Sequence, residues 1–339
     1  MVARNTFPVY DAIVYNISVL RDVNAKDKNT FKVRAYNKVL QSMKEYQKSV
    51  SRDINVNDIA SIPNLSEVMR KKIAEIIDTG ELHQVKEMGE DVLRETEAVN
   101  SLVNVSGIGQ VKARQLYQKH GIKNVSDLKD KLKEDPGIIN EVQKIGVKHY
   151  DDLVKRIPRK EMIKHDGFIG KVMSEAGLTY DIVGSYRREE KTSGDIDVLI
   201  RIQPGKQASE VLDHVISELS KKKYVLDKLA HGDKKFMGVC KLPRHRTARR
   251  LDVIVVTEEH YPFMVLYFTG SDKFNIAMRK LALEKGYSLN EYGLTATTTD
   301  AKNALANLSR PITDERHVFE FLGIPYVSPT DRKHFTSFQ

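Results

Sequence analysis

The pattern of hydrophobic residues changes once along this chain of 339 residues, and the change limits the folds that it can adopt. Up to about residue 155, apolar residues recur at spacings of three and four, as in 31–50, which is typical of helices with one buried face. We find no strand pattern before about residue 180. Short runs rich in β-branched residues then follow, as in 195–201 and 251–256. The sequence therefore predicts a multidomain protein, with an all-helical amino-terminal part and a mixed α and β part.

The expected elements follow from this pattern and from the turn residues between the runs. A linker at 156–159 is the predicted boundary between the two parts. The expected helices are 31–50, 58–62, 69–77, 90–102, 111–119, 209–220 and 274–285, and the expected strands are 180–183, 195–201, 236–241 and 251–256.

Charge and composition narrow the function classes. Lys and Arg number 55 against 46 Asp and Glu, a formal charge of 55 − 46 = +9, which favours a polyanionic partner. Many basic proteins bind no nucleic acid, and the absence of Trp argues against a base-stacking surface. Cys240 is the single cysteine, which excludes a disulfide framework and a cysteine-rich zinc finger. With no membrane-spanning apolar run and no signal-peptide pattern at the start, we expect a soluble intracellular protein.

Three carboxylates are the candidate catalytic residues. Asp195 and Asp197 stand two apart in an expected strand, so both side chains leave the same face. Carboxylates aimed at one point repel each other unless a hard cation such as Mg²⁺ lies between them. Asp252, in a second apolar run, would complete a two-metal site for phosphoryl transfer. The ordinary alternatives are a solvated strand end for the pair and a salt-bridged acid for Asp252.

A phosphate-binding turn is expected just upstream of the carboxylates. Gly184 and Ser185 follow the expected strand 180–183 at a point where a helix can begin, and Arg187 and Arg188 come next. The first N–H groups of a helix and its dipole favour a bound phosphate. Together with the carboxylates, this turn indicates a site for a nucleoside triphosphate.

These motifs resemble a known family. The run Gly184-Ser-Tyr-Arg-Arg188, followed by Ser193-Gly-Asp-Ile-Asp197, is similar to the signature of the nucleotidyltransferase superfamily, in the form found in the family X DNA polymerases of the beta type. Residues 236–240, 267–275, 284–292 and 318–326 are similar to further segments of that family, so the resemblance extends from about 34 to 332.

The resemblance implies a fold and a division of the chain. Residues 1–90 would form a helical, lyase-like domain that binds a 5′-phosphate, and 91–155 a DNA-binding subdomain with a helix-hairpin-helix. Residues 156–261 would form the α/β nucleotidyltransferase palm, and 262–339 a carboxy-terminal nucleotide-binding subdomain.

The resemblance also implies roles for particular residues. Asp195 and Asp197 would bind two Mg²⁺ ions, for which Mn²⁺ can substitute, and Asp252 would hold the catalytic ion and help deprotonate the primer 3′-hydroxyl. Residues at the nucleotide would be Gly184, Ser185, Arg188, Ser193, Gly194, Lys144, Tyr267, Phe268, Gly270, Asp272 and Asn275. Residues at the DNA would be Gly107, Gly109, Lys235, Arg250, Arg279, Tyr292, Arg34, Arg70 and Lys71. Without the family, Tyr267 and Phe268 would be read as core aromatics.

Two hairpins between helices are candidate DNA contacts. In Val105-Ser-Gly-Ile-Gly109 the glycines let a DNA backbone approach, although an ordinary glycine-capped turn has the same pattern. The family implies a monovalent cation, Na⁺ or K⁺, held there by the carbonyls of Val103, Val105 and Ile108. The other hairpin, 62–66, departs from the pattern, because Asn64 and Ser66 stand where glycines are usual.

A second activity is less well supported by the sequence. Family members often remove a 5′-deoxyribose phosphate through a Schiff-base lysine, which aligns with Lys72. A basic helix face that docks on a 5′-phosphate explains Lys72 equally well. Several nearby positions depart from the family: Ala35, Val68 and Gln84 replace lysines and Val39 replaces a tyrosine. We therefore expect weak or lost lyase activity. Ile254 likewise replaces the arginine that this family usually has two residues after the third aspartate, which leaves fidelity open.

The sequence thus predicts a DNA-directed DNA polymerase that fills short gaps during base-excision repair. Template-independent addition by a terminal or tailing transferase is the second hypothesis, and a non-catalytic DNA-binding scaffold the third. The expected partners are gapped or nicked DNA and deoxynucleoside triphosphates, with no membrane, and we expect a monomer. We expect it in the nucleus of a eukaryotic cell, or in the cytoplasm or virion if a cytoplasmic DNA virus encodes it.

Overall fold

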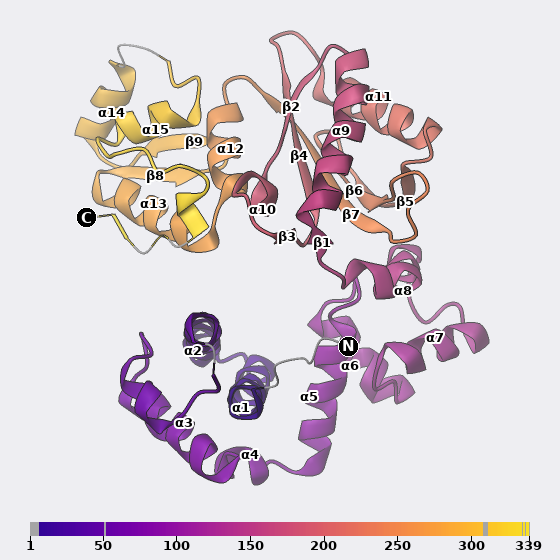
Figure 1. The fold of residues 1–339 in the computed structure, drawn as a ribbon, viewed down its shortest axis with the longest axis vertical. Helices are drawn as coiled ribbons and strands as arrows, with labels where there is room; N and C mark the ends of the chain where they lie inside the picture. The colour runs from indigo at the N-terminus through magenta and orange to yellow at the C-terminus, as the bar shows by residue number, and fades with distance from the viewer. Residues whose placement is uncertain (1–6, 51, 308–310, 334, 336, 339) are drawn as a thin grey trace. The chain divides into compact units, whose positions relative to one another are not determined.

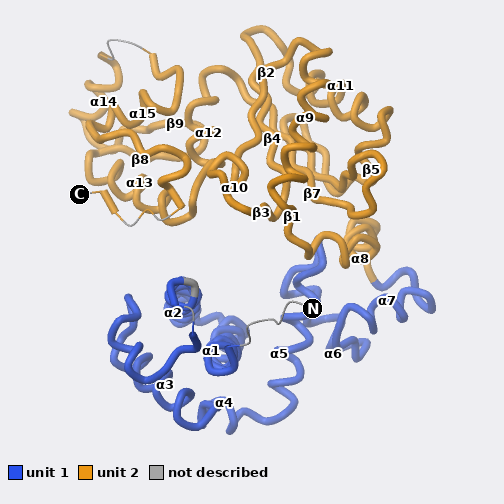
Figure 2. Tube along the Cα trace, viewed as in Figure 1, with its two compact units in different colours: residues 1–138 blue, residues 139–339 orange. Residues whose placement is uncertain are grey.

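The computed structural model describes every residue except 1–6, 51, 308–310, 334, 336 and 339. The chain divides into two compact units, residues 1–138 and 139–339, and each is described by itself (Figure 2).

The first unit is entirely helical in its described residues (Figure 1). Ile13 and Ile17 of the first helix pack with Met43 of the second and Ile73 of the third, so the predicted apolar faces form one core. Side chains of Asn29 and Ser66 accept hydrogen bonds at two helix starts. The elements are α1 (Pro8–Lys26), α2 (Thr30–Ser49), η1 (Val56–Ala60), α3 (Glu67–Thr79), α4 (His83–Lys86), α5 (Glu90–Leu102), α6 (Gln110–His120) and α7 (Val125–Glu134).

The second unit contains a five-stranded mixed sheet in the order β2-β4-β7-β6-β5. β4 and β7 are parallel, and the other neighbours are antiparallel. The elements up to the last sheet strand are α8 (Glu141–Leu153), β1 (Ile157–Pro158), α9 (Arg159–Glu175), β2 (Thr179–Ile182), α10 (Gly184–Arg187), β3 (Thr192–Ser193), β4 (Ile196–Ile202), α11 (Ala208–Lys221), β5 (Val225–His231), β6 (Lys235–Cys240) and β7 (Arg249–Thr257).

The two faces of this sheet have different neighbours. Ile196 and Val198 of β4 and Leu251 and Val253 of β7 belong to one core with the buried residues of α9 and α11. The alternate residues face the other way, where Leu199 and Ile254 pack in a second core with α12 (Tyr261–Thr269). Because side chains alternate along a strand, Asp197 and Asp252 lie on this second face, Asp197 at the start of β4 and Asp252 within β7.

The carboxy-terminal part forms a third core around Phe274 and Phe319. After α12 it contains α13 (Asp272–Glu284), β8 (Tyr287–Asn290), β9 (Gly293–Ala296), α14 (Thr299–Ala306), α15 (Glu315–Phe321) and η2 (Asp331–Lys333).

Most predicted elements are confirmed, with limits moved by a few residues. The expected helix at 58–62 is instead a 3-10 helix that ends at Ala60. The expectation that strands begin only near residue 180 was wrong by one short element, because β1 at Ile157–Pro158 pairs with β3. The sequence patterns also missed the short strands β3, β8 and β9, and β5, most of whose residues are partly or fully exposed. No helix among the described residues is long and apolar enough to cross a membrane.

Candidate active site

The structure places two of the three predicted carboxylates side by side. Asp197 of β4 and Asp252 of β7 are register partners on adjacent parallel strands, so their side chains leave the same face of the sheet. Asp195 directly precedes β4 and has the same alternation as Asp197. The three residues therefore gather beside the amino-terminal end of β4.

The carboxylates repel one another in this arrangement. Burial, together with the nearby Asp195 and Asp252, raises the pKa of Asp197 to about 7. Burial and Asp252 also raise the pKa of Asp195. Such repulsion is relieved when a divalent cation lies among the oxygen atoms.

Two cationic side chains partly neutralise the negative charge of these carboxylates. Asp252 is paired with Arg250, at 3.2 Å from Nε to Oδ1, and with Lys235, at 3.4 Å from Nζ to Oδ2. Across the described part of the chain, no three His, Cys, Asp or Glu side chains already form a metal cage. The donor set nonetheless fits divalent ions, since carboxylate oxygens are the ligands that Mg²⁺ prefers and Asp197 is poor in countercharge.

Gly184 brings the start of α10 against Asp197. A Cβ at this position would lie 2.7 Å from Asp197 Oδ2, and the residue has φ +62°, a left-handed conformation that favours glycine. Ser185 follows in the same turn of helix. The expected phosphate-binding turn thus adjoins the carboxylates.

Arg188 directly follows this turn and reaches the segment after α12. Its Nη1 donates to the carbonyl of Thr269 at 2.6 Å. Its buried Nε has no hydrogen-bond partner in the described structure, and Glu190 Oε1 lies 3.9 Å away. A Cβ on Gly270 would approach Arg188 Nη1 to 3.4 Å, so two sequence-distant parts of the predicted nucleotide site adjoin. The unpaired N–H is suited to an anionic oxygen.

Sequence reasoning missed Arg156 at this site. Its Nε and Nη2 donate to the hydroxyl and carbonyl of Thr192, at 3.1 and 2.7 Å. A Cβ on Gly194 would lie 3.1 Å from Arg156 Nη1, and the guanidinium opposes the rise in the pKa of Asp195. Buried Ser193 lies between these residues. We read Arg156 only as part of a linker, because no local pattern distinguishes its side chain from other solvated arginines.

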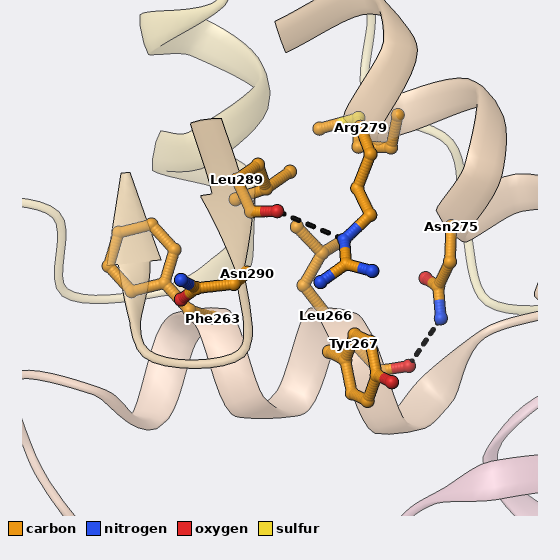
Figure 3. Close-up of a pocket in the computed structure, with 8 residues that line it drawn as sticks. Phe263, Leu266, Tyr267, Asn275, Arg279, Leu289 and Asn290 are labelled. Atoms are coloured by element: carbon orange, nitrogen blue, oxygen red, sulfur yellow. Dashed lines mark hydrogen bonds between the residues drawn. The ribbon is translucent and has the colours of Figure 1, made fainter. Parts of the chain in front are cut away.

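Three of the predicted residues, Tyr267, Asn275 and Arg279, line a small cavity of about 10 Å³ next to α12 and α13 (Figure 3). Asn275 Nδ2 donates to the carbonyl of Tyr267 at 2.8 Å. Arg279 Nε donates to the carbonyl of Leu289 at 3.0 Å, and its guanidinium lies 5.4 Å from the centre of the Tyr267 ring. Phe268 packs edge-on against Tyr267. Asp272 is the first residue of α13. Burial lowers the pKa of Arg188, and the negative charge of Asp272 opposes this shift.

Lys144 and Tyr292 are not brought to the carboxylates by any contact in the structure. Lys144 Nζ pairs with Glu141 on the first turn of α8, at 2.6 Å. Tyr292 is exposed in the turn between β8 and β9, with its ring edge-on to His260. Ile254 is buried beside Leu199 in the core under α12, so this position packs and makes no ion pair.

The two hairpins of the first unit have matching turns. Gly107 has φ +85°, and Asn64 at the corresponding position has φ +62°. Gly109 and Ser66 then precede α6 and α3. In the hairpin at 105–109, Val103 is the C-cap of α5, and the Val105 carbonyl accepts the Ile108 N–H at 3.0 Å. Asn64 therefore adopts the conformation that glycine usually supplies, which the residue types did not reveal.

The predicted 5′-phosphate residues lie on α2 and α3. Lys71 and Arg34 are exposed, while Arg70 Nη1 donates to the carbonyl of Ile59 at 2.5 Å. Lys72 Nζ donates to Gln84 Oε1, and burial lowers the pKa of its amine, with Glu75 acting in the opposite direction. The amine therefore loses its proton more readily than that of a free lysine, but it is engaged with the Gln84 amide.

Four family models match successive parts of the chain. They are a helix-hairpin-helix domain over residues 13–82, the fingers domain of DNA polymerase lambda over 100–154, the DNA polymerase beta palm over 156–258 and the DNA polymerase beta thumb over 264–333.

Curated relatives match across most of the chain. DNA polymerase lambda of Rattus norvegicus is 31% identical, covering 94% of this chain and 56% of the relative. DNA polymerase lambda of Arabidopsis thaliana is 30% identical, over 84% and 55% respectively. The DNA polymerase/3'-5' exonuclease PolX of Bacillus subtilis (strain 168) is 26% identical, over 91% and 52%. The chain thus spans about half the length of these relatives.

Proposed function

The chain belongs to the family X DNA polymerases, and on that premise we propose that it fills short gaps in DNA during base-excision repair. The proposed reaction is transfer of a deoxynucleotide from its triphosphate to a primer 3′-hydroxyl. The observation that supports it best is the pairing of Asp197 with Asp252 on adjacent parallel strands, on the sheet face opposite α9 and α11.

The carboxylates would divide the work of metal binding. A palm of this family implies divalent metal ions, and when bound they would neutralise the triphosphate and lower the pKa of the attacking hydroxyl. We propose that Asp195 and Asp197 hold both ions and that Asp252 holds the catalytic one and helps to accept the proton of the 3′-hydroxyl. Arg250 and Lys235, which pair with Asp252 here, would then be released toward the phosphates of the DNA.

The nucleotide would lie between α10 and the segment that follows α12. Ser185, Arg188 and Arg156 supply N–H and O–H donors for the phosphate oxygens, and the unpaired Nε of Arg188 is one of them. Tyr267 and Phe268 would border the sugar, and Asn275 and Asp272 the base. Arg279 would exchange the Leu289 carbonyl for the template strand.

We propose that the first unit holds the DNA. The hairpin around Gly107 and Gly109 would contact the primer strand through Na⁺ or K⁺ bound by the carbonyls of Val103, Val105 and Ile108. Arg34, Arg70 and Lys71 would meet the 5′-phosphate of the gap. The four-part division at residues 90, 155 and 261 fits these roles.

Filling of a one-nucleotide gap that carries a 5′-phosphate, compared with extension of an open primer–template, tests the proposal. We expect faster incorporation at the gap, and a loss of at least about 10³-fold in Asp252→Ala, because one metal ligand and the proton acceptor are removed together. Equal incorporation without any template strand would favour a template-independent transferase, and no incorporation with Mg²⁺ or Mn²⁺ would favour a scaffold.

Lyase activity is proposed to be weak or absent, because Lys72 is hydrogen-bonded to Gln84. Borohydride trapping on 5′-incised abasic DNA should give little covalent adduct. A strong adduct that disappears in Lys72→Ala would contradict this expectation, and Lys71→Ala is the matched control on the same helix.

A further inference from the structure

The phosphate-binding turn depends on its neighbours for its orientation. α10 contains only the four residues Gly184–Arg187. A single helical turn has too few internal hydrogen bonds to be stable by itself. Contacts made by its side chains therefore decide where Ser185 and Arg188 point.

One carboxylate on α9 receives the tyrosine of this turn. Tyr186 Oη donates to Asp166 Oδ2 at 2.9 Å, and Tyr180 Oη, from β2, donates to Asp166 Oδ1 at 2.7 Å. Both carboxylate oxygens of Asp166 thus accept hydrogen bonds from tyrosine hydroxyls. One tyrosine is on β2, which directly precedes the phosphate-binding turn, and the other is on α10, which forms it. Hydrogen bonds to an ionised carboxylate are among the strong ones in proteins.

Two further contacts fix the positions of Tyr186 and Tyr180. Arg159 lies over the Tyr186 ring, 4.9 Å from its centre, and its Nη1 donates to the Tyr186 carbonyl at 3.0 Å. Gly170 lies one turn after Asp166 on α9, where a Cβ would come within 2.6 Å of the Tyr180 hydroxyl. Glycine inside a helix is less favourable than alanine, so its place here is explained by the room that the Tyr180 hydroxyl needs.

We propose that Asp166 is a positioning residue for the incoming nucleotide, acting through the hydroxyl of Tyr186 to hold α10 against α9. The inference rests on the proposed function, because α10 is taken to bind the triphosphate. Asp166 does not touch the nucleotide in this proposal. It fixes the direction of the N–H and O–H donors of Ser185 and Arg188.

Tyr180 provides an internal control. It donates to the same carboxylate but belongs to β2, whose position is set by ladder hydrogen bonds with β4. Tyr180→Phe and Tyr186→Phe each remove one hydroxyl and leave the ring in place. If Asp166 had only a structural role, the two variants would have the same affinity for the nucleotide. If it positions α10, only Tyr186→Phe should weaken nucleotide binding.

The decisive measurement is the equilibrium binding of a fluorescent deoxynucleoside triphosphate to the full chain on gapped DNA with a dideoxy-terminated primer and Mg²⁺. We expect Tyr186→Phe to raise the Kd for the nucleotide by about 5- to 10-fold. Tyr180→Phe should change it by less than about 2-fold. The Kd for DNA and the melting temperature should stay close to those of the parent chain in both variants.

A double-mutant comparison tests whether Asp166 acts through Tyr186. In the Tyr186→Phe background, Asp166→Ala should change the Kd by no more than about 2-fold, although it weakens binding in the parent chain. Equal Kd values for Tyr186→Phe and Tyr180→Phe would overturn the inference. Additive effects of Asp166→Ala and Tyr186→Phe on the Kd would also overturn it. Because this readout does not need catalysis, failure of the parent chain to incorporate nucleotides would count only against the proposed function.

Discussion

At the scale of single residues, the site depends on close approaches that only particular side chains allow. Gly184 combines a left-handed backbone with a Cβ position only 2.7 Å from Asp197 Oδ2. Gly184→Ala should therefore displace either α10 or the carboxylate. We expect gap filling to fall by about 10- to 100-fold and the free energy of unfolding by about 1–2 kcal/mol.

Gly177 is the matched control for this substitution. It has φ +64°, and nothing lies within 4 Å of its Cβ position. Gly177→Ala carries the same backbone strain and should lose similar stability with little change in activity, measured by denaturant unfolding and primer extension. If both variants lose activity equally, the contact with Asp197 is unimportant.

His165 gives the palm a dependence on pH. Its side chain is 1% exposed, and burial lowers its pKa to about 4, while Glu161 acts in the opposite direction and Arg249 and His245 in the same one. The unfolded chain therefore binds the proton more readily than the folded chain between pH 6.5 and 4. Stability from neutral His165 is complete above pH 6.5 and is lost as the pH falls toward 4.

We expect this residue to cost about 2 kcal/mol of unfolding free energy between pH 7 and pH 5. Chemical denaturation at both pH values measures the loss, and His165→Phe should reduce it. An equal loss in the variant would show that other groups cause the acid sensitivity. His245, whose charge also acts on the pKa of His165, is the position for the control substitution.

At the scale of elements, one carboxylate joins α10 to the carboxy-terminal elements of the second unit. Glu315 of α15 accepts from Arg187 of α10 at 2.7 Å and pairs with Arg332 of η2 at 3.1 Å. Glu315 is 6% exposed and Arg332 is fully buried. Tyr326 donates a third hydrogen bond to the same carboxylate. The network ties α10 to the carboxy-terminal core.

Removing the shared carboxylate should leave the buried guanidinium of Arg332 and the partly buried guanidinium of Arg187 without their anion. We expect Glu315→Gln to lower the free energy of unfolding by about 3–5 kcal/mol, measured by denaturant unfolding. The exposed pair Lys280–Glu284 on α13 supplies the control, and Glu284→Gln should cost less than about 0.5 kcal/mol. A similar loss in both variants would argue against the network.

At the scale of the whole molecule, the charge of +9 is expected to appear as salt-dependent binding. Arg34 and Lys71 are exposed on α2 and α3, and each phosphate contact contributes about 0.9 to the slope of log K against log salt. Neutralising both residues with alanine should reduce the slope for 5′-phosphorylated gapped DNA by about 2.

Lys131 and Lys133 on α7 provide the control pair. Each is already paired with a carboxylate on the same helix, Glu134 or Asp130. Replacing both by alanine should leave the slope nearly unchanged in a titration across salt concentrations. If the two double variants behave alike, net charge rather than the α2 and α3 surface determines binding.

Much of the architecture could be predicted because local patterns determine it. The three- and four-residue spacing predicted α2, α3, α5, α6, α11 and α13, with α5 correct at both ends, Glu90–Leu102, but it did not predict α9 or α12. β-Branched runs identified the central strands, but β8 and β9, a hairpin of four-residue strands, lack such runs and were not predicted. Asp195 and Asp197 could be assigned to one face, since alternation in a strand is a local property.

By itself, the sequence determined which side chains we propose for the chemistry and how side chains alternate within their own strand or helix. Only the tertiary structure decided which of them meet. β7 pairs with β4 although β5 and β6 come between them in the chain, and this register places Asp252 beside Asp197. The same packing brings Arg156 to Gly194 and Asp166 to Tyr186. Contacts between distant segments depend on how apolar faces pack together, and no local pattern of residues records that packing.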